Sequence, residues 1–271
     1  MYNGIFILMI FCIFNAGLTF AQSERFTLIH TIPVKASMVT SDELGNVYTV
    51  NNNMLSKFDP NGKLLYTYSN LLAGDITFAD PRDPFKVLVF YQGFGQIELL
   101  DNTLSLTTNT ISLNMLGLEL STLACPSYQN GFWVYNPQNF ELIRIDQFLE
   151  ITDRTGNITK VTGFRINPNY LIERDNIVYM NDQENGIMLF DKFGTYYKTI
   201  NIKGLDSFQV FGRKIIFTND STLTILDPKT LEEVQIDLPV DNFKSAAFNF
   251  GTKEKRLFLI KNDQLMIYSF N

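Results

Sequence analysis

Leu55-Ser-Lys-Phe-Asp59 is the first of six similar segments whose recurrence decides the fold. Each segment is apolar at its first and fourth positions, five of the six end in Asp, and their last residues are spaced by 42, 45, 45, 36 and 42 positions. The other segments are Ile97-Glu-Leu-Leu-Asp101, Leu142-Ile-Arg-Ile-Asp146, Ile187-Met-Leu-Phe-Asp191, Leu223-Thr-Ile-Leu-Asp227 and Leu265-Met-Ile-Tyr-Ser269. A regular period of this length indicates one supersecondary unit repeated along the chain.

Further β-type runs accompany these segments. In the first unit one run opens the unit at residues 36–40, a second precedes the segment at 47–50, and a third follows it at 63–69. The runs are rich in Val, Ile, Phe, Tyr and Thr and are separated by Gly, Asn, Asp and Pro, which favours strands. Four strands of about 6 residues with four connections of about 4 give a unit of about 40 residues. No helical stretch is visible, so the sequence predicts an all-β, six-bladed β-propeller with four-stranded antiparallel blades.

The ends of the chain predict how the ring closes. The sixth unit holds only three of the four runs, and the missing type appears at residues 25–32. We therefore expect this N-terminal strand to pair in the last blade, which removes a free sheet edge that could template aggregation.

The first 21 residues have the pattern of a signal peptide. Residues 5–14 are almost wholly apolar, and Thr19-Phe20-Ala21 places small residues before a cleavage site near Ala21. No later segment is apolar enough to span a membrane. We expect an exported, soluble protein, periplasmic or secreted, whose residues 22–271 form a single propeller domain with no direct membrane insertion.

The charge balance excludes one class of partner. Lys and Arg number 22 against 28 Asp and Glu, giving a formal net charge of −6. Binding to nucleic acid needs clustered basic residues, and the chain has no basic run. No nucleic-acid partner is expected.

No concentrated catalytic chemistry is visible. His30 is the only histidine and falls in the expected closing strand, and Cys125 is the only cysteine outside the leader, so no His-rich or thiolate metal site can form. A glycosidase needs paired carboxylates, and its possible members Glu173, Glu119 and Asp80 share no motif. These observations weigh against an enzyme and predict no catalytic residue.

Loops that lead into the innermost strands offer the best binding candidates. Asp75, Asp206, Asp241 and Lys35 lie before such strands in different blades, at the expected mouth of the axial channel. Three carboxylates there could hold a cation such as Ca²⁺, although turn and loop chemistry explains isolated Asp residues equally well. The repeated Asp is interpreted as structural, with its carboxylate accepting backbone N–H groups in a turn at Asp59, Asp101, Asp146, Asp191 and Asp227.

Two stretches resemble a known repeat. Asp42-Glu-Leu-Gly-Asn-Val-Tyr-Thr-Val50 followed by Leu55-Ser-Lys-Phe-Asp-Pro-Asn-Gly62 is similar to the NHL-type repeat of six-bladed propellers, and Asp175-Asn-Ile-Val-Tyr-Met-Asn-Asp182 with Phe190-Asp-Lys-Phe-Gly194 is a looser copy. The resemblance implies architecture but no single activity.

The function expected from these features is that of a non-catalytic scaffold for a protein partner in the bacterial envelope. A small exported propeller of this kind resembles the plug subunit of the type 9 secretion translocon, which would make an outer-membrane protein the partner. The alternative is a lactonase-like or glycosidase-like hydrolase with a cation, for instance Ca²⁺, in the axial channel.

Overall fold

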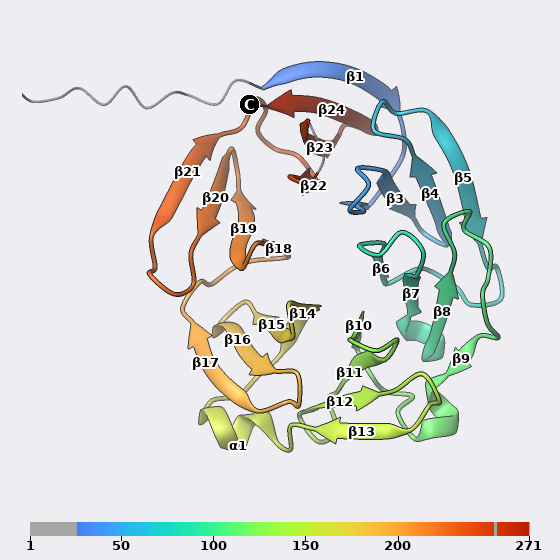
Figure 1. The fold of residues 1–271 in the computed structure, drawn as a ribbon, viewed down its shortest axis with the longest axis vertical. Helices are drawn as coiled ribbons and strands as arrows, with labels where there is room; N and C mark the ends of the chain where they lie inside the picture. The colour runs from blue at the N-terminus through green and yellow to red at the C-terminus, as the bar shows by residue number, and fades with distance from the viewer. Residues whose placement is uncertain (1–25, 252–253, 271) are drawn as a thin grey trace, which may run out of the picture.

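The computed structural model describes residues 26–251 and 254–270, and within them six four-stranded antiparallel sheets stand as blades around a central axis (Figure 1). The expected signal peptide lies outside the described residues. The strands of blades 1 to 3 are β2 (Met38–Ser41), β3 (Val47–Asn51), β4 (Met54–Phe58), β5 (Leu64–Ser69), β6 (Phe78–Asp80), β7 (Val87–Tyr91), β8 (Gln96–Leu100), β9 (Ile111–Ser112), β10 (Leu123–Pro126), β11 (Phe132–Asn136), β12 (Glu141–Ile145) and β13 (Ile151–Arg154).

Blades 4 and 5 repeat this order, and the last blade departs from it. Their strands and those of blade 6 are β14 (Pro168–Arg174), β15 (Ile177–Asp182), β16 (Gly186–Asp191), β17 (Tyr196–Ile200), β18 (Gln209–Phe211), β19 (Lys214–Asn219), β20 (Thr222–Leu226), β21 (Glu233–Asp237), β22 (Ser245–Asn249), β23 (Lys255–Lys261) and β24 (Gln264–Phe270).

The fourth strand of blade 6 is β1 (Thr27–Pro33), from the other end of the chain. It pairs antiparallel with β24, placing Thr31 opposite Met266 and Ile32 opposite Leu265 (Figure 1). The six-bladed fold and its closure by an N-terminal strand are thus confirmed.

Each buried apolar cluster lies between two neighbouring blades. Successive residues of a strand point to opposite faces of its sheet, so Val47 packs in the cluster between blades 6 and 1 while Tyr48 packs in the cluster between blades 1 and 2. This is why the central strands are apolar without a polar face, and why Val47–Asn51 is buried along most of its length.

The recurring Asp forms the turn between the third and outer strands. Asp59 Oδ1 accepts hydrogen bonds from the backbone N–H groups of Asn61 and Lys63, both at 2.9 Å. Asp191 accepts in the same way from Phe193 and Thr195 at 2.9 and 2.8 Å. The same turn occurs at Asp101 and Asp146, and in a turn one residue longer Asp227 accepts from Lys229 N and Thr230 N.

The expectation of no helix is wrong at one place. A short helix, α1 (Ile158–Thr162), lies in the connection between β13 (Ile151–Arg154) and β14. Asn157 caps it by accepting a hydrogen bond from Lys160 N, and Gly163 ends it with φ 82°. Two 3₁₀ turns, η1 (Gln92–Phe94) and η2 (Leu113–Leu116), lie in blade 2 and in the loop that leaves it.

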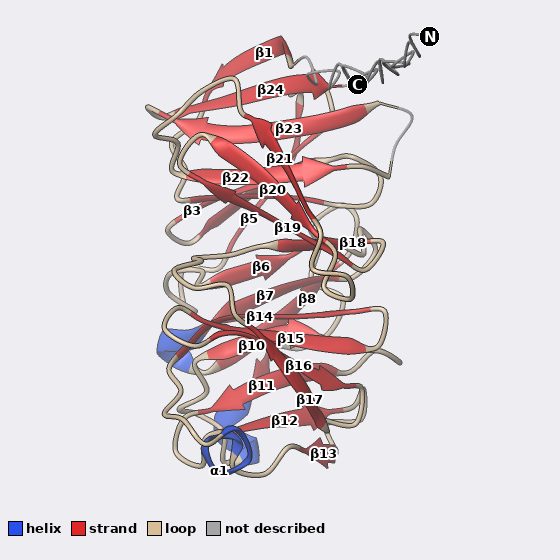
Figure 2. Cartoon of the chain, turned by 90° about the vertical axis from the view of Figure 1, so that its left-hand side faces the viewer, coloured by secondary structure: helices blue, strands red, loops and turns tan. Residues whose placement is uncertain are grey.

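Figure 2 shows the ring from the side, with its helical turns in blue. No helix in the described part of the chain is long and apolar enough to cross a membrane.

Candidate functional site

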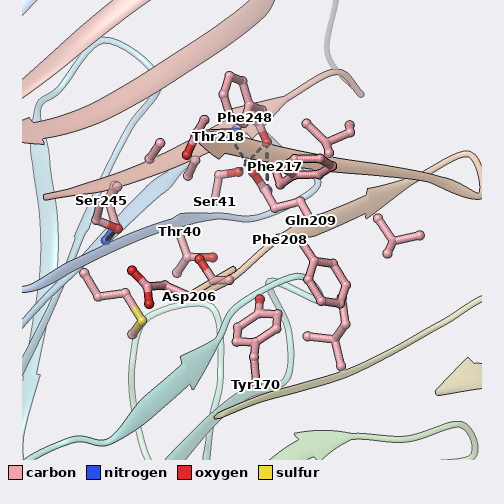
Figure 3. Close-up of a pocket in the computed structure, with 18 of the residues that line it drawn as sticks. Thr40, Ser41, Tyr170, Asp206, Phe208, Gln209, Phe217, Thr218, Ser245 and Phe248 are labelled. Carbon is pink, nitrogen blue, oxygen red and sulfur yellow. Dashed lines mark hydrogen bonds between the residues drawn. The ribbon is translucent and has the colours of Figure 1, made fainter. Parts of the chain in front are cut away.

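A cavity of about 670 Å³ opens along the ring axis. Residues of the inner strands β2, β6, β14, β18 and β22, from five of the six blades, line it (Figure 3). Because the blades share one strand order around one axis, the loops leading into the inner strands all lie on one side of the ring, which we call the top face. The turns that follow the inner strands lie on the opposite side, the bottom face.

Aromatic rings form much of the cavity wall. Tyr170 contacts Phe78 and Phe208 edge to face, with ring centroids 5.7 and 5.2 Å apart. Phe248 and Phe250 stack at 6.2 Å on β22 and its following turn. Phe78 is half-buried and packs against the clusters of blades 2 to 5, which places this ring close to the axis.

The amide side chain of Gln209 joins the inner strands of blades 5 and 6 through two hydrogen bonds. Gln209 Oε1 accepts a hydrogen bond from Phe248 N at 2.6 Å, and its Nε2 donates to Phe248 O at 3.1 Å. The Ser41 hydroxyl donates to the same carbonyl at 3.1 Å, and Ser245 Oγ accepts from Val39 N at 3.0 Å. The inner strands of blades 5, 6 and 1 are therefore joined by side chains that satisfy exposed backbone groups.

Two arginines of the cavity wall are paired with carboxylates. Arg82 binds Asp80 through two nitrogens, with Nη2 2.6 Å from Oδ2, and Arg174 Nη2 lies 2.6 Å from Glu43 Oε1. Burial, together with the charge of Asp80, raises the pKa of Tyr170 far above its ordinary value, so its hydroxyl keeps its proton. The wall thus presents a neutral phenol hydroxyl and two ion pairs, while Asp206, Asp220 and Lys244 are exposed members of the lining.

Glu173, a candidate carboxylate of a glycosidase, has a different role. Its side chain accepts hydrogen bonds from Ser127 Oγ at 2.6 Å, Trp133 Nε1 at 2.8 Å and Tyr128 N at 3.2 Å. Its backbone carbonyl accepts from Arg82 Nη1. The residue therefore links blades 2, 3 and 4. The other two candidates do not join it as a free pair, because Asp80 is bound to Arg82 and Glu119 is exposed on a top-face loop.

Of the four residues predicted at the channel mouth, Asp206 lines the cavity (Figure 3). Its Oδ1 accepts a hydrogen bond from Gln183 Nε2 at 2.7 Å. Asp75 and Lys35 are exposed on top-face loops, and neither they nor Asp241 belong to the cavity lining.

Asp241 is engaged elsewhere. Its Oδ1 lies 3.2 Å from Lys261 Nζ, and the hydrogen bond and charge of that lysine lower the pKa of the aspartate. Among the described residues no group of three or more His, Cys, Asp or Glu side chains is placed to hold a metal ion. The structure does not bring Asp75, Asp206 and Asp241 together.

The sequence's rare nucleophiles do not line the cavity. His30 is exposed on β1, the outer strand of blade 6. Cys125 is fully buried in blade 3, and this burial raises the pKa of its thiol, so the thiolate needed for reactivity is disfavoured.

An exposed apolar surface on the top face was not predicted. Five large side chains there are between 53% and 87% exposed, and together we call them the top-face patch: Leu71, Leu72, Phe94, Met115 and Leu120. They lie on the loop between β5 and β6, on η1, and on the η2 loop that leads into β10.

Close backbone approaches hold the three loops of the patch together. A Cβ on Gly74 would lie 3.1 Å from the Phe94 ring, and one on Gly95 would lie 3.1 Å from Glu119 O. Leu113 N, at the start of η2, donates to Gly95 O at 2.8 Å. Residues far apart in sequence are thus neighbours on one surface.

Comparison with known proteins supports the fold and leaves the activity open. No family model and no curated relative matches the chain. A chain of the mitotic checkpoint complex is similar in structure, with a TM-score of 0.65 and 8% identity over 99% of both chains. The Pan2 WD40 domain of Neurospora crassa has a TM-score of 0.60 and 8% identity over 90% of this chain and 95% of that one.

Some enzymes are also similar to this chain in structure. A catalytically inactive histidine-to-alanine variant of virginiamycin B lyase from Staphylococcus aureus, in complex with quinupristin, has a TM-score of 0.57 and 14% identity over 90% of this chain and 99% of that one. At such identities these similarities establish a propeller fold that both enzymes and WD40 domains use.

Proposed function

We propose that this propeller is a non-catalytic platform that binds a protein partner through the top-face patch. The observation that carries the proposal is the patch itself, because contiguous apolar side chains this exposed are uncommon on a surface that has no partner. Loops on a rigid scaffold are the usual place for binding residues.

The charges around the patch indicate the chemistry of the partner. Across the three loops that carry it, residues 70–77, 92–95 and 113–122, the charged residues are Asp75 and Glu119, and there is no Lys or Arg. An anionic lipid surface would need basic residues here. The patch suits an apolar segment flanked by basic residues, and Asp75 then acts at the rim of the interface rather than as a cation ligand.

The scarcity of catalytic side chains in this chain favours a platform over the alternative hydrolase. The lyase variant named above shows that a histidine matters for catalysis in that enzyme, whereas the one histidine here, His30, sits at the outer edge of the ring. Another of the similar chains belongs to a complex of several proteins. A cation-dependent enzyme would require Ca²⁺ to bind near Asp206, and calorimetric titration with Ca²⁺ tests that directly.

The proposal includes a location. With residues 1–21 acting as a signal peptide, the platform works in the bacterial envelope, and an outer-membrane protein, such as the barrel of a type 9 secretion translocon, is the partner. The stretches that resemble the NHL-type repeat agree with a six-bladed architecture for this platform. Mass spectrometry of the protein from its native cells tests the export step: it should begin at Gln22 in the periplasmic or secreted fraction.

A paired set of variants tests the docking surface. Leu72→Ser combined with Met115→Ser removes two of the most exposed patch side chains, and Phe148→Ser combined with Phe193→Ser removes two exposed rings of the bottom face as a matched control. Affinity purification from the native envelope should recover a stoichiometric partner with the parent and the control.

With the patch variant, recovery should fall at least tenfold, since individual hot-spot side chains contribute 2 kcal/mol or more, as an order of magnitude. Absence of a stable partner, or equal loss in both variants, would contradict the proposal.

A further inference from the structure

We propose that the axial cavity is a second, independent binding site, which takes a small uncharged aromatic molecule carrying one or two hydrogen-bonding groups. The inference does not rest on the top-face patch or on its partner. It rests on three properties of the cavity: its size, its aromatic walls and its unused hydroxyl groups.

The size fits a small organic ligand. Pockets that bind such ligands have volumes of about 300–1,000 Å³. At about 670 Å³ the axial cavity lies well inside that range, and it is far larger than the space of one buried water, about 30 Å³.

The walls provide two groups of aromatic rings. Phe78, Tyr170 and Phe208 come from blades 2, 4 and 5, and Tyr170 contacts the other two rings edge to face. Phe211 and Phe250, from blades 5 and 6, pack at 5.4 Å near the bottom face. Rings arranged in this way offer edges and faces to a further ring, and aromatic pairs gain free energy beyond their buried area.

Three hydroxyl groups of the cavity wall are available to a ligand. They belong to Thr40 of blade 1, Tyr170 of blade 4 and Thr218 of blade 5, and the hydrogen bonds of the described residues involve none of them, whereas Gln209 and Ser41 are already used by the Phe248 backbone. In Figure 3 the hydroxyl of Tyr170 points into the cavity. A ligand with one hydrogen-bond donor or acceptor can therefore be oriented by a hydroxyl group from any of three blades.

The charges favour a neutral ligand and disfavour an anion. Arg82 and Arg174 are paired with Asp80 and Glu43. The other charged groups of the lining that face solvent, Asp206, Asp220 and Lys244, are exposed, so a charged ligand held between the aromatic rings would lose hydration without a buried partner of opposite charge. The lining holds five acidic residues against three basic ones, namely Asp42, Glu43, Asp80, Asp206 and Asp220 against Arg82, Arg174 and Lys244, which adds repulsion for anions.

N-phenyl-1-naphthylamine tests the proposal, because it is uncharged, aromatic, carries one N–H donor and fluoresces on entering an apolar site. Titration into the mature chain should give saturable fluorescence enhancement with a stoichiometry of one. Tyr170→Phe removes only a hydroxyl and should weaken binding about threefold to tenfold, the usual value of one hydrogen bond. Ser207→Trp and Thr218→Trp place a ring in the cavity and should each weaken it at least tenfold.

The controls separate this site from other apolar surfaces. The Leu72→Ser and Met115→Ser patch variant should bind the probe as the parent does, and 1-anilinonaphthalene-8-sulfonate, an anionic dye, should bind at least tenfold more weakly. Circular dichroism confirms that each variant is folded. The proposal is overturned if the probe does not saturate, if the patch variant loses binding while both tryptophan variants keep it, or if the anion or a cationic analogue binds as well as the neutral probe.

Discussion

Replacing Glu173 by Ala should destabilise the ring more than any change at its surface. The carboxylate accepts three hydrogen bonds, from Ser127, Tyr128 and Trp133, and the residue is only 8% exposed. Leaving one buried donor unsatisfied costs about 1–3 kcal/mol, and within residues 26–251 and 254–270 Trp133 Nε1 has no other hydrogen-bond partner. With the loss of the two remaining bonds, the free energy of unfolding should fall by about 3–5 kcal/mol.

Urea unfolding measures this change well because Trp133 is the only tryptophan and reports directly on the junction of blades 3 and 4. Glu173→Gln keeps an acceptor for the indole N–H and should cost about 1–2 kcal/mol. Glu184→Ala, at an exposed position, should stay within about 0.5 kcal/mol of the parent. A loss below about 1 kcal/mol for the alanine variant, or equal losses for Ala and Gln, would refute the reasoning.

Three further predictions each concern the hydrogen bonds of one side chain. Gln209→Leu leaves the N–H of Phe248 without its side-chain acceptor and leaves the C=O with the Ser41 hydroxyl alone, so the free energy of unfolding should fall by about 1–3 kcal/mol, measured by urea unfolding; an unchanged midpoint would show that the bridge is dispensable. Asp191→Ala removes the acceptor of two backbone N–H groups and should cost about 1 kcal/mol, whereas Asp191→Asn should restore most of it. Backbone hydrogen bonds hold the pKa of Asp227 below its ordinary value of 3.8, so the stability it contributes is present above that value and is lost as pH falls through the lowered one; thermal melts between about pH 2 and 6 should show a shallower acid loss for Asp227→Asn, and parallel curves would contradict this.

The sequence predicted the fold because the central strands are buried on both faces. Packing between neighbouring blades requires apolar runs at a fixed period, and a turn Asp recurs at the end of the third strand in five of the six units. The outer strand of blade 2 departs from this pattern. The β-type run that follows Asp101, residues 104–111, forms only a single bridge between Leu106 and Leu100 before Ile111–Ser112 pairs as β9.

The candidate site was predicted less completely, for a physical reason. Sequence order identifies which loops lead to the channel, but the direction of each side chain depends on local partners. Asp206 reaches the cavity beside Gln183, whereas Asp241 turns to Lys261. Leu71 and Leu72 cannot be told from core leucines by composition, since only the folded loops show that they lie outside.

Hydrogen exchange of β1 tests the central claim most directly, because the patch and the cavity both take their geometry from a closed ring. If residues 28–32 pair with β24, their amides should be protected as strongly as those of the outer strand β5, and Thr31→Pro should expose the amides of β24 as well. Exchange of residues 28–32 at the rate of a free peptide, with β24 equally protected in the parent and the proline variant, would contradict a ring closed by this strand.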